Sequence, residues 1–126
     1  MSHFTQVATK ITNKELLLSC LKELGYEVEE KMSIRGYRGQ ETPVDIAVRM
    51  RQGYDVGFTL GPDGTYSFVA DWFGVQGVTE QQFTAKVQQH YALATVMEQV
   101  NRQGFNVVEQ QQDANGQIRL VVRRWV

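Results

Sequence analysis

Apolar residues recur along this chain with two different periods, and the changes of period divide it into strands and helices. A period of two with β-branched residues predicts a strand over residues 2–11. Leucines and Cys20 at helical spacing predict a helix over residues 13–24, and a strand is predicted over residues 26–31. Residues 32–43 contain two glycines, a proline and no sustained period, which predicts a loop.

The middle of the chain has the clearest alternation. Strands are predicted over residues 45–51, 54–60 and 65–72. A short turn at residues 52–53 and a Gly-Pro-Asp-Gly turn at residues 61–64 separate them. Because the turns are short, these segments predict a meander of three antiparallel strands.

A continuous apolar face over residues 80–103 predicts a second, longer helix. Two more strands are predicted over residues 105–111 and 117–126, with a turn at residues 113–116. The longer helix is expected to supply the largest block of the core, through Phe83, Val87, Tyr91, Ala94, Met97 and Val100.

The two helices are expected to begin and end alike. Thr12 and Thr79 are the predicted N-caps, each with Glu or Gln three residues later, as in a capping box. Each helix is followed by a glycine, Gly25 or Gly104, where the left-handed conformation favours glycine. Each half therefore has the pattern of a β-α-β-β unit, with one extra strand between the two halves, and a pseudo-twofold axis would relate the two units.

This order of elements predicts the α+β class, as a two-layer sandwich of a mainly antiparallel sheet with two helices on one face. At 126 residues, the chain is expected to form a single domain over residues 1–126. An apolar fraction of 42% is ordinary for a globular protein. No stretch approaches the roughly 20 apolar residues of a membrane span, and we identify no signal peptide.

Several segments carry a family resemblance: Met-Ser-His-Phe-Thr-Gln-Val-Ala-Thr-Lys-Ile-Thr-Asn at the start, then Leu-Lys-Glu-Leu-Gly-Tyr, Val-Asp-Ile-Ala-Val-Arg and Gly-Phe-Asn-Val-Val-Glu. Over nearly its whole length the chain resembles a family of small proteins of cyanobacteria and algal plastids, the hypothetical chloroplast reading frame thirty-five. The resemblance implies a soluble protein of a cyanobacterial cytosol or a plastid stroma. The resemblance implies no catalytic residue in this chain.

The residue types needed for catalysis or metal binding do not form a recognisable pattern. His3, Cys20 and His90 have no ligand spacing between them, so no metal site is expected. Cys20 lies on the apolar stripe of its helix, which is typical of a small buried residue. The run at residues 36–39 is too short for a phosphate loop. We therefore expect no catalytic residue, no metal and no cofactor.

Arginines mark the predicted binding surface. Those in the strands alternate with core aliphatic residues, so we expect them to share one face of the sheet, opposite the helices. Because guanidinium groups form bidentate bonds with carboxylates, the pattern predicts a non-enzymatic accessory or interaction protein that docks an acidic protein partner. The docking surface would be this sheet face or the 32–43 loop, and a merely solvated face is the alternative. The candidate residues are Arg35, Arg38, Arg49, Arg51, Arg119 and Arg123.

Two other functions stay open from the sequence. A small-ligand binder or enzyme would have its site near the longer helix, around Tyr66, Trp72 and His90. A nucleic-acid binder would use the sheet face or the basic and aromatic residues of the 32–43 loop. A net charge of −1 provides no overall attraction to polyanions. The sequence predicts neither the identity of a partner nor the oligomeric state.

Overall fold

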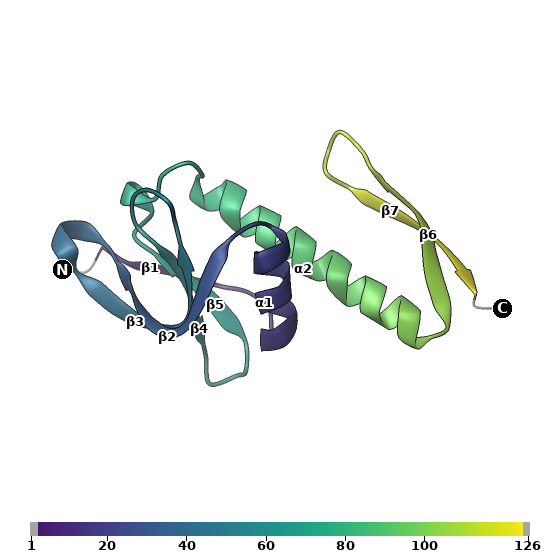
Figure 1. Cartoon of the computed structure of the whole chain (residues 1–126), viewed down its shortest axis with the longest axis horizontal. Coiled ribbons are helices and arrows are strands. Elements are labelled where there is room, and N and C mark those ends of the chain that lie inside the picture. The colour runs from purple at the N-terminus through teal and green to yellow at the C-terminus, as the bar shows by residue number, and fades with distance from the viewer. Residues whose placement is uncertain (1–2, 125–126) are drawn as a thin grey trace.

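The computed structural model describes residues 3–124 and has the predicted α+β class (Figure 1). The elements in chain order are β1 (Thr5–Ala8), α1 (Lys14–Glu23), β2 (Glu27–Arg35), β3 (Glu41–Arg49), β4 (Val56–Leu60), β5 (Tyr66–Ala70), α2 (Glu80–Arg102), β6 (Phe105–Gln112) and β7 (Ile118–Arg124). Short 3-10 turns lie at Tyr37–Gly39 and Trp72–Gly74. Residue 2 of the first predicted strand and residues 125–126 of the last lie outside the described residues.

The strands divide between two antiparallel sheets. One has five strands in the order β1-β5-β4-β3-β2, and within it the predicted meander of β3, β4 and β5 is confirmed. The other sheet contains β6 and β7 alone. The structure does not confirm the pseudo-twofold repeat, because the final hairpin forms a sheet of its own on α2 while the corresponding strands of the first half pair within the large sheet (Figure 1).

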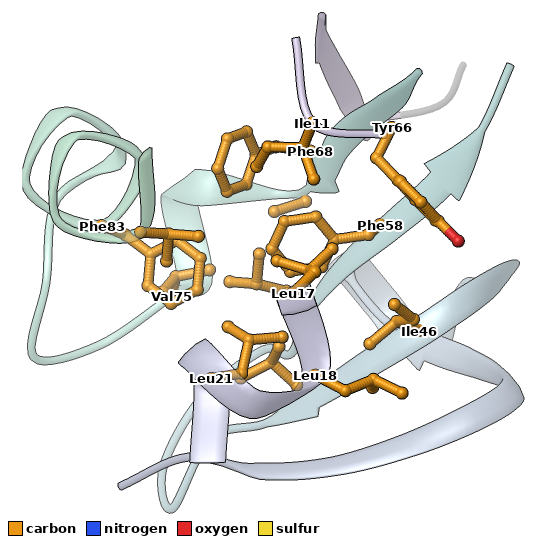
Figure 2. Close-up of a cluster of buried hydrophobic side chains, with 14 residues drawn as sticks. Ile11, Leu17, Leu18, Leu21, Ile46, Phe58, Tyr66, Phe68, Val75 and Phe83 are labelled. Atoms are coloured by element: carbon orange, nitrogen blue, oxygen red, sulfur yellow. The ribbon is translucent and has the colours of Figure 1, made fainter. Parts of the chain in front are cut away.

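Both helices cover one face of the five-stranded sheet. Leu17 and Leu21 of α1 and Phe83 of α2 are fully buried against Phe58 and Phe68 of the sheet (Figure 2). The Phe58 and Phe68 rings lie 4.8 Å apart, and the Phe68 and Phe83 rings lie 5.9 Å apart. These contacts fix the first turns of α2 to the centre of the sheet.

The expectation that α2 supplies the largest block of the core is wrong in extent. Phe83 and Val87 are fully buried, which confirms the phase of the helix. The later apolar positions of the predicted stripe are only partly buried. The reason is that α2 extends beyond the five-stranded sheet, and its second half lies beside the two-stranded β6–β7 hairpin, which buries it only in part (Figure 1). The partly buried residues are Tyr91, Ala94, Met97 and Val100.

The capping box of α2 is confirmed. Thr79 Oγ1 accepts a hydrogen bond from the Gln82 backbone N–H at 3.1 Å, and Gln82 Oε1 accepts one from the Thr79 N–H at 3.0 Å. The predicted glycines also follow both helices, with φ of 89° at Gly25 and 85° at Gly104.

The N-cap of α1 differs from the prediction. The cap is Asn13, whose Oδ1 accepts a hydrogen bond from the Leu16 N–H at 3.1 Å, and not Thr12. Asparagine caps at least as well as threonine, so the helix begins one residue later than expected. The N–H groups of Thr12 and Asn13 both donate to the Tyr91 hydroxyl, which joins this turn to α2.

The predicted loop over residues 32–43 is wrong in extent, because only residues 36–40 lie between the two strands. Residues 32–35 continue β2 and residues 41–43 begin β3, and the two strands pair through the register of Met32 with Val44 and Arg35 with Glu41. The periodic pattern is hidden because Lys31 takes a positive φ of 55°, a conformation rare outside glycine. This residue interrupts the alternation of faces that the search for a strand relies on.

The sheet face opposite the helices carries a second, smaller core. Ile34, Val44, Ala47 and Val69 are buried together there, with Phe4 packed against them. The extended β2–β3 hairpin supplies Ile34 and Val44. The prediction of a free solvent face behind the sheet is therefore wrong at this position.

Candidate functional site

Asp55, directly before β4, carries a buried charge. Its side chain is fully buried. Arg49 Nη1 donates to Asp55 Oδ2 at 2.9 Å, and Arg35 donates to both carboxylate oxygens, at 3.2 and 3.4 Å. The Met50 N–H also donates to Oδ1 at 3.4 Å. The carboxylate thus gathers two guanidinium groups from the β2–β3 hairpin.

Arg49 makes further hydrogen bonds within the same cluster. Its Nε donates to Glu29 Oε1 at 3.1 Å, and its Nη1 donates to the Ser33 carbonyl at 3.0 Å. Burial would raise the pKa of Asp55, but hydrogen bonds from Arg35, the Met50 N–H and Arg49 outweigh it and lower the pKa below its usual value. Arg35 and Arg49 therefore neutralise a buried charge and stabilise the hairpin.

A second carboxylate holds the tip of this hairpin. Asp71 is buried, and its Oδ2 accepts a hydrogen bond from the Tyr37 N–H at 3.1 Å. The His3 ring lies 4.4 Å from the Tyr37 ring, and the Arg38 guanidinium lies 5.1 Å from it. These contacts tie the tip to the end of β5 and to the start of the chain.

A cleft of about 800 Å³ lies along the β2–β3 hairpin. Basic residues line it, Lys31 and Arg35 among them, but Glu41 and Asp45 line it as well. Charges of both signs face this space, and Arg35 is already paired with Asp55. The cleft therefore has no net positive potential that would attract an anion.

The candidate catalytic residues do not form a reactive site. Cys20 is buried, and burial followed by the charge of Glu23 raises the pKa of its thiol to about 11. His90 Nε2 lies 2.7 Å from Glu23 Oε2, so it joins α2 to α1 at the surface. Within residues 3–124, no three His, Cys, Asp or Glu side chains come together as a metal ion would require. Neither helix in this range has the length and hydropathy needed to cross a bilayer.

Tyr66 and Trp72, proposed from the sequence to line a ligand site, lie at different ends of the core. Trp72 packs against Phe83, with 5.9 Å between the ring centroids. Figure 2 shows Tyr66 on the side of the cluster away from Phe83, with its hydroxyl pointing outward. The structure therefore does not bring these residues together.

The arginines of β7 have different surroundings. Arg119 and Arg123 are exposed and form no ion pair with any of the described residues. Opposite them on β6 are Gln111 and Asn106, which carry no charge. Val121, between the two arginines on the same side of the strand, is 41% exposed. We call Arg119, Val121 and Arg123 the β7 arginine face.

The other side of β7 faces α2. Ile118 and Leu120 line an open space together with Leu93 and Val96 of the helix. The turn between β6 and β7 is tied to the helix as well, because the Gln89 side chain donates to the Gly116 carbonyl. The β7 arginine face is therefore held pointing away from α2.

The structure separates the predicted docking residues. Arg49 belongs to the five-stranded sheet and Arg119 to the two-stranded sheet, so the expected shared face does not form. Arg38 and Arg51 are exposed at turns of the large sheet. Sequence reasoning missed the buried Asp55 and Asp71. An aspartate next to a strand is usually exposed, and the local sequence does not show which distant residues will bury it.

Three relatives match almost the whole chain, and each is called "Uncharacterized protein ycf35". The protein of Cyanophora paradoxa is 35% identical, that of Pyropia yezoensis 33% and that of Guillardia theta 32%, each alignment covering 99% of this chain and 98% of the relative. A family model described as "Protein of unknown function (DUF1257)" matches residues 20–121. No solved structure matches significantly.

Proposed function

We propose that this chain, which belongs to the family described as protein of unknown function (DUF1257), is a non-enzymatic interaction protein that docks an acidic protein partner. The relatives confirm the resemblance noted in the sequence. The resemblance to this family of cyanobacteria and algal plastids, which the relatives called "Uncharacterized protein ycf35" share, supports a proposed location in a plastid stroma or a cyanobacterial cytosol.

The observation that carries this proposal is the contrast between two pairs of arginines. Arg35 and Arg49 both form ion pairs with Asp55, whose side chain is fully buried. Arg119 and Arg123 have no acidic partner among the described residues. Unpaired arginines beside a partly exposed valine resemble the composition of protein interfaces, which are enriched in Arg around an apolar centre.

The position of the hairpin also supports docking. None of the described residues of β6 or β7 is buried, so the hairpin adds little to either hydrophobic core. An antiparallel hairpin that packs through one face has polar residues on the other. On β7 the side away from α2 presents two cations, which suits recognition of carboxylates.

The proposal is tested by capture from a cyanobacterial lysate at low and at raised salt. We compare the wild type with Arg119→Gln/Arg123→Gln, and with the matched control Arg38→Gln/Arg51→Gln, which removes two other exposed positive charges. Captured proteins are identified after nuclease treatment.

We expect the wild type and the control to retain the same acidic proteins at low salt, and the β7 double variant to lose them. Raised salt should weaken retention by the wild type, because exposed charges are screened. Capture of the same proteins by all three, at equal strength, would contradict docking through β7. Loss of the captured material on nuclease treatment would favour the nucleic-acid alternative.

A further inference from the structure

The sheet formed by β6 and β7 has two strands, and β7 is one of its edges. A two-stranded hairpin alone is only marginally stable in water, and this one is supported on one face by packing against α2. Within residues 3–124, β7 pairs with β6 on one side and with no strand on the other (Figure 1). Its second edge therefore offers backbone N–H and C=O groups to an additional strand.

The charges on β7 limit which strand can be added. Arg119 and Arg123 would repel another basic edge and attract a strand that carries carboxylates. The other edge strands of the described residues differ. β2 carries Glu27, Glu29 and Glu30, β6 carries Glu109 and no basic residue, and β1 carries no charged residue. Among these four edges, only β7 carries a row of arginines on one side of the strand.

We propose that the open edge of β7 binds an extended acidic segment of a partner protein by β-strand addition. This inference rests on the proposed function and states how the partner is recognised. Backbone hydrogen bonds along β7 provide affinity for any extended chain, and the arginines select for acidic side chains.

The spacing on β7 defines the segment. Arg119 and Arg123 are four residues apart, which in a strand is about 13 Å. A partner strand has the same rise, so acidic residues at positions i and i+4 stand beside the arginines. The residue at i+2 stands beside Val121 and should be apolar, because Val121 is partly exposed. The motif is therefore an acidic residue, any residue, an apolar residue, any residue and an acidic residue.

The test uses fluorescein-labelled peptides and the full chain, with fluorescence polarisation as the readout. The probe is Thr-Glu-Thr-Val-Thr-Glu-Thr with blocked ends. A control of the same composition, Thr-Glu-Glu-Val-Thr-Thr-Thr, places the two glutamates on opposite sides of the strand. Probes N-methylated at single backbone positions report which amides bind the edge, and the protein itself is unchanged.

We expect the probe to bind more tightly than the control, and Arg119→Gln/Arg123→Gln to weaken the probe while Arg38→Gln/Arg51→Gln does not. Because alternate N–H groups of a strand point to the same neighbour, N-methylation should weaken binding about tenfold at every second position and little between them. Binding with no such alternation would overturn strand addition and leave docking by side chains intact.

Other results separate this inference from the proposed function. If no peptide binds while acidic proteins are still captured through β7, strand addition is wrong and the proposed function stands. If neither peptides nor acidic proteins bind, both are wrong. A dimer seen by light scattering and lost in Arg119→Gln/Arg123→Gln would show that the edge takes a second copy of this chain, which also overturns the inference.

Discussion

Replacing Asp55 with asparagine removes the buried charge that organises the β2–β3 hairpin, while nearly keeping the shape of the side chain. The fully buried carboxylate accepts bonds from Arg35, Arg49 and the Met50 N–H. Removing one partner of a buried ion pair costs about 3–5 kcal/mol, because the other charge stays uncompensated. Here Arg49 keeps Glu29 at 3.1 Å, and the Arg35 side chain is 59% exposed. We therefore expect a smaller loss, about 2–3 kcal/mol in the free energy of unfolding.

The assay is urea unfolding at pH 7 and at lower pH, with Glu27→Gln as the matched control. Glu27 is exposed on β2 and forms no ion pair with the described residues, so its replacement changes the net charge equally. The free energy of unfolding of a domain is typically about 5–15 kcal/mol, so a loss of this size is a large fraction of the total. Equal unfolding midpoints for Asp55→Asn and Glu27→Gln would refute the reasoning.

The pH dependence follows from the lowered pKa of Asp55. Its folded pKa lies below the unfolded value, so the stabilisation is fully present above the unfolded pKa of about 3.9. It is lost as the pH falls through the folded pKa. The difference in stability between the wild type and Asp55→Asn should therefore be largest near neutrality and shrink below about pH 4. A difference that grows on acidification would contradict this origin.

Two further predictions concern the helices. Asn13→Ala and Thr79→Ala should each lower the free energy of unfolding by about 0.5–2 kcal/mol, and Thr12→Ala should have little effect, as measured by urea midpoints. If Thr12→Ala costs as much as Asn13→Ala, the observed cap of α1 is wrong. Because burial raises the pKa of the Cys20 thiol to about 11, iodoacetamide at pH 8 should label it slowly in the folded protein and rapidly in urea. Rapid labelling without denaturant would contradict its burial in the core.

The local pattern of the sequence determined most of the elements. The alternation in β3, β4 and β5, with glycine-rich turns between them, predicted the meander because a strand hides every second residue from water. The apolar stripe of α2 and its Thr79 cap were predicted for the same kind of local reason. The α+β class follows from these elements, since each helix has one apolar face to bury.

Only the tertiary structure decided how the arginines are used. Arg49 and Arg119 have the same local pattern, each alternating with aliphatic residues in a strand. Arg49 meets a buried carboxylate because the β2–β3 hairpin extends over the outer face of the sheet, and Arg119 meets none among the described residues because its hairpin packs on α2 instead. A charge pattern specifies which side of a strand a residue occupies. Whether that side is covered depends on contacts between segments far apart in the chain, which a local period does not encode.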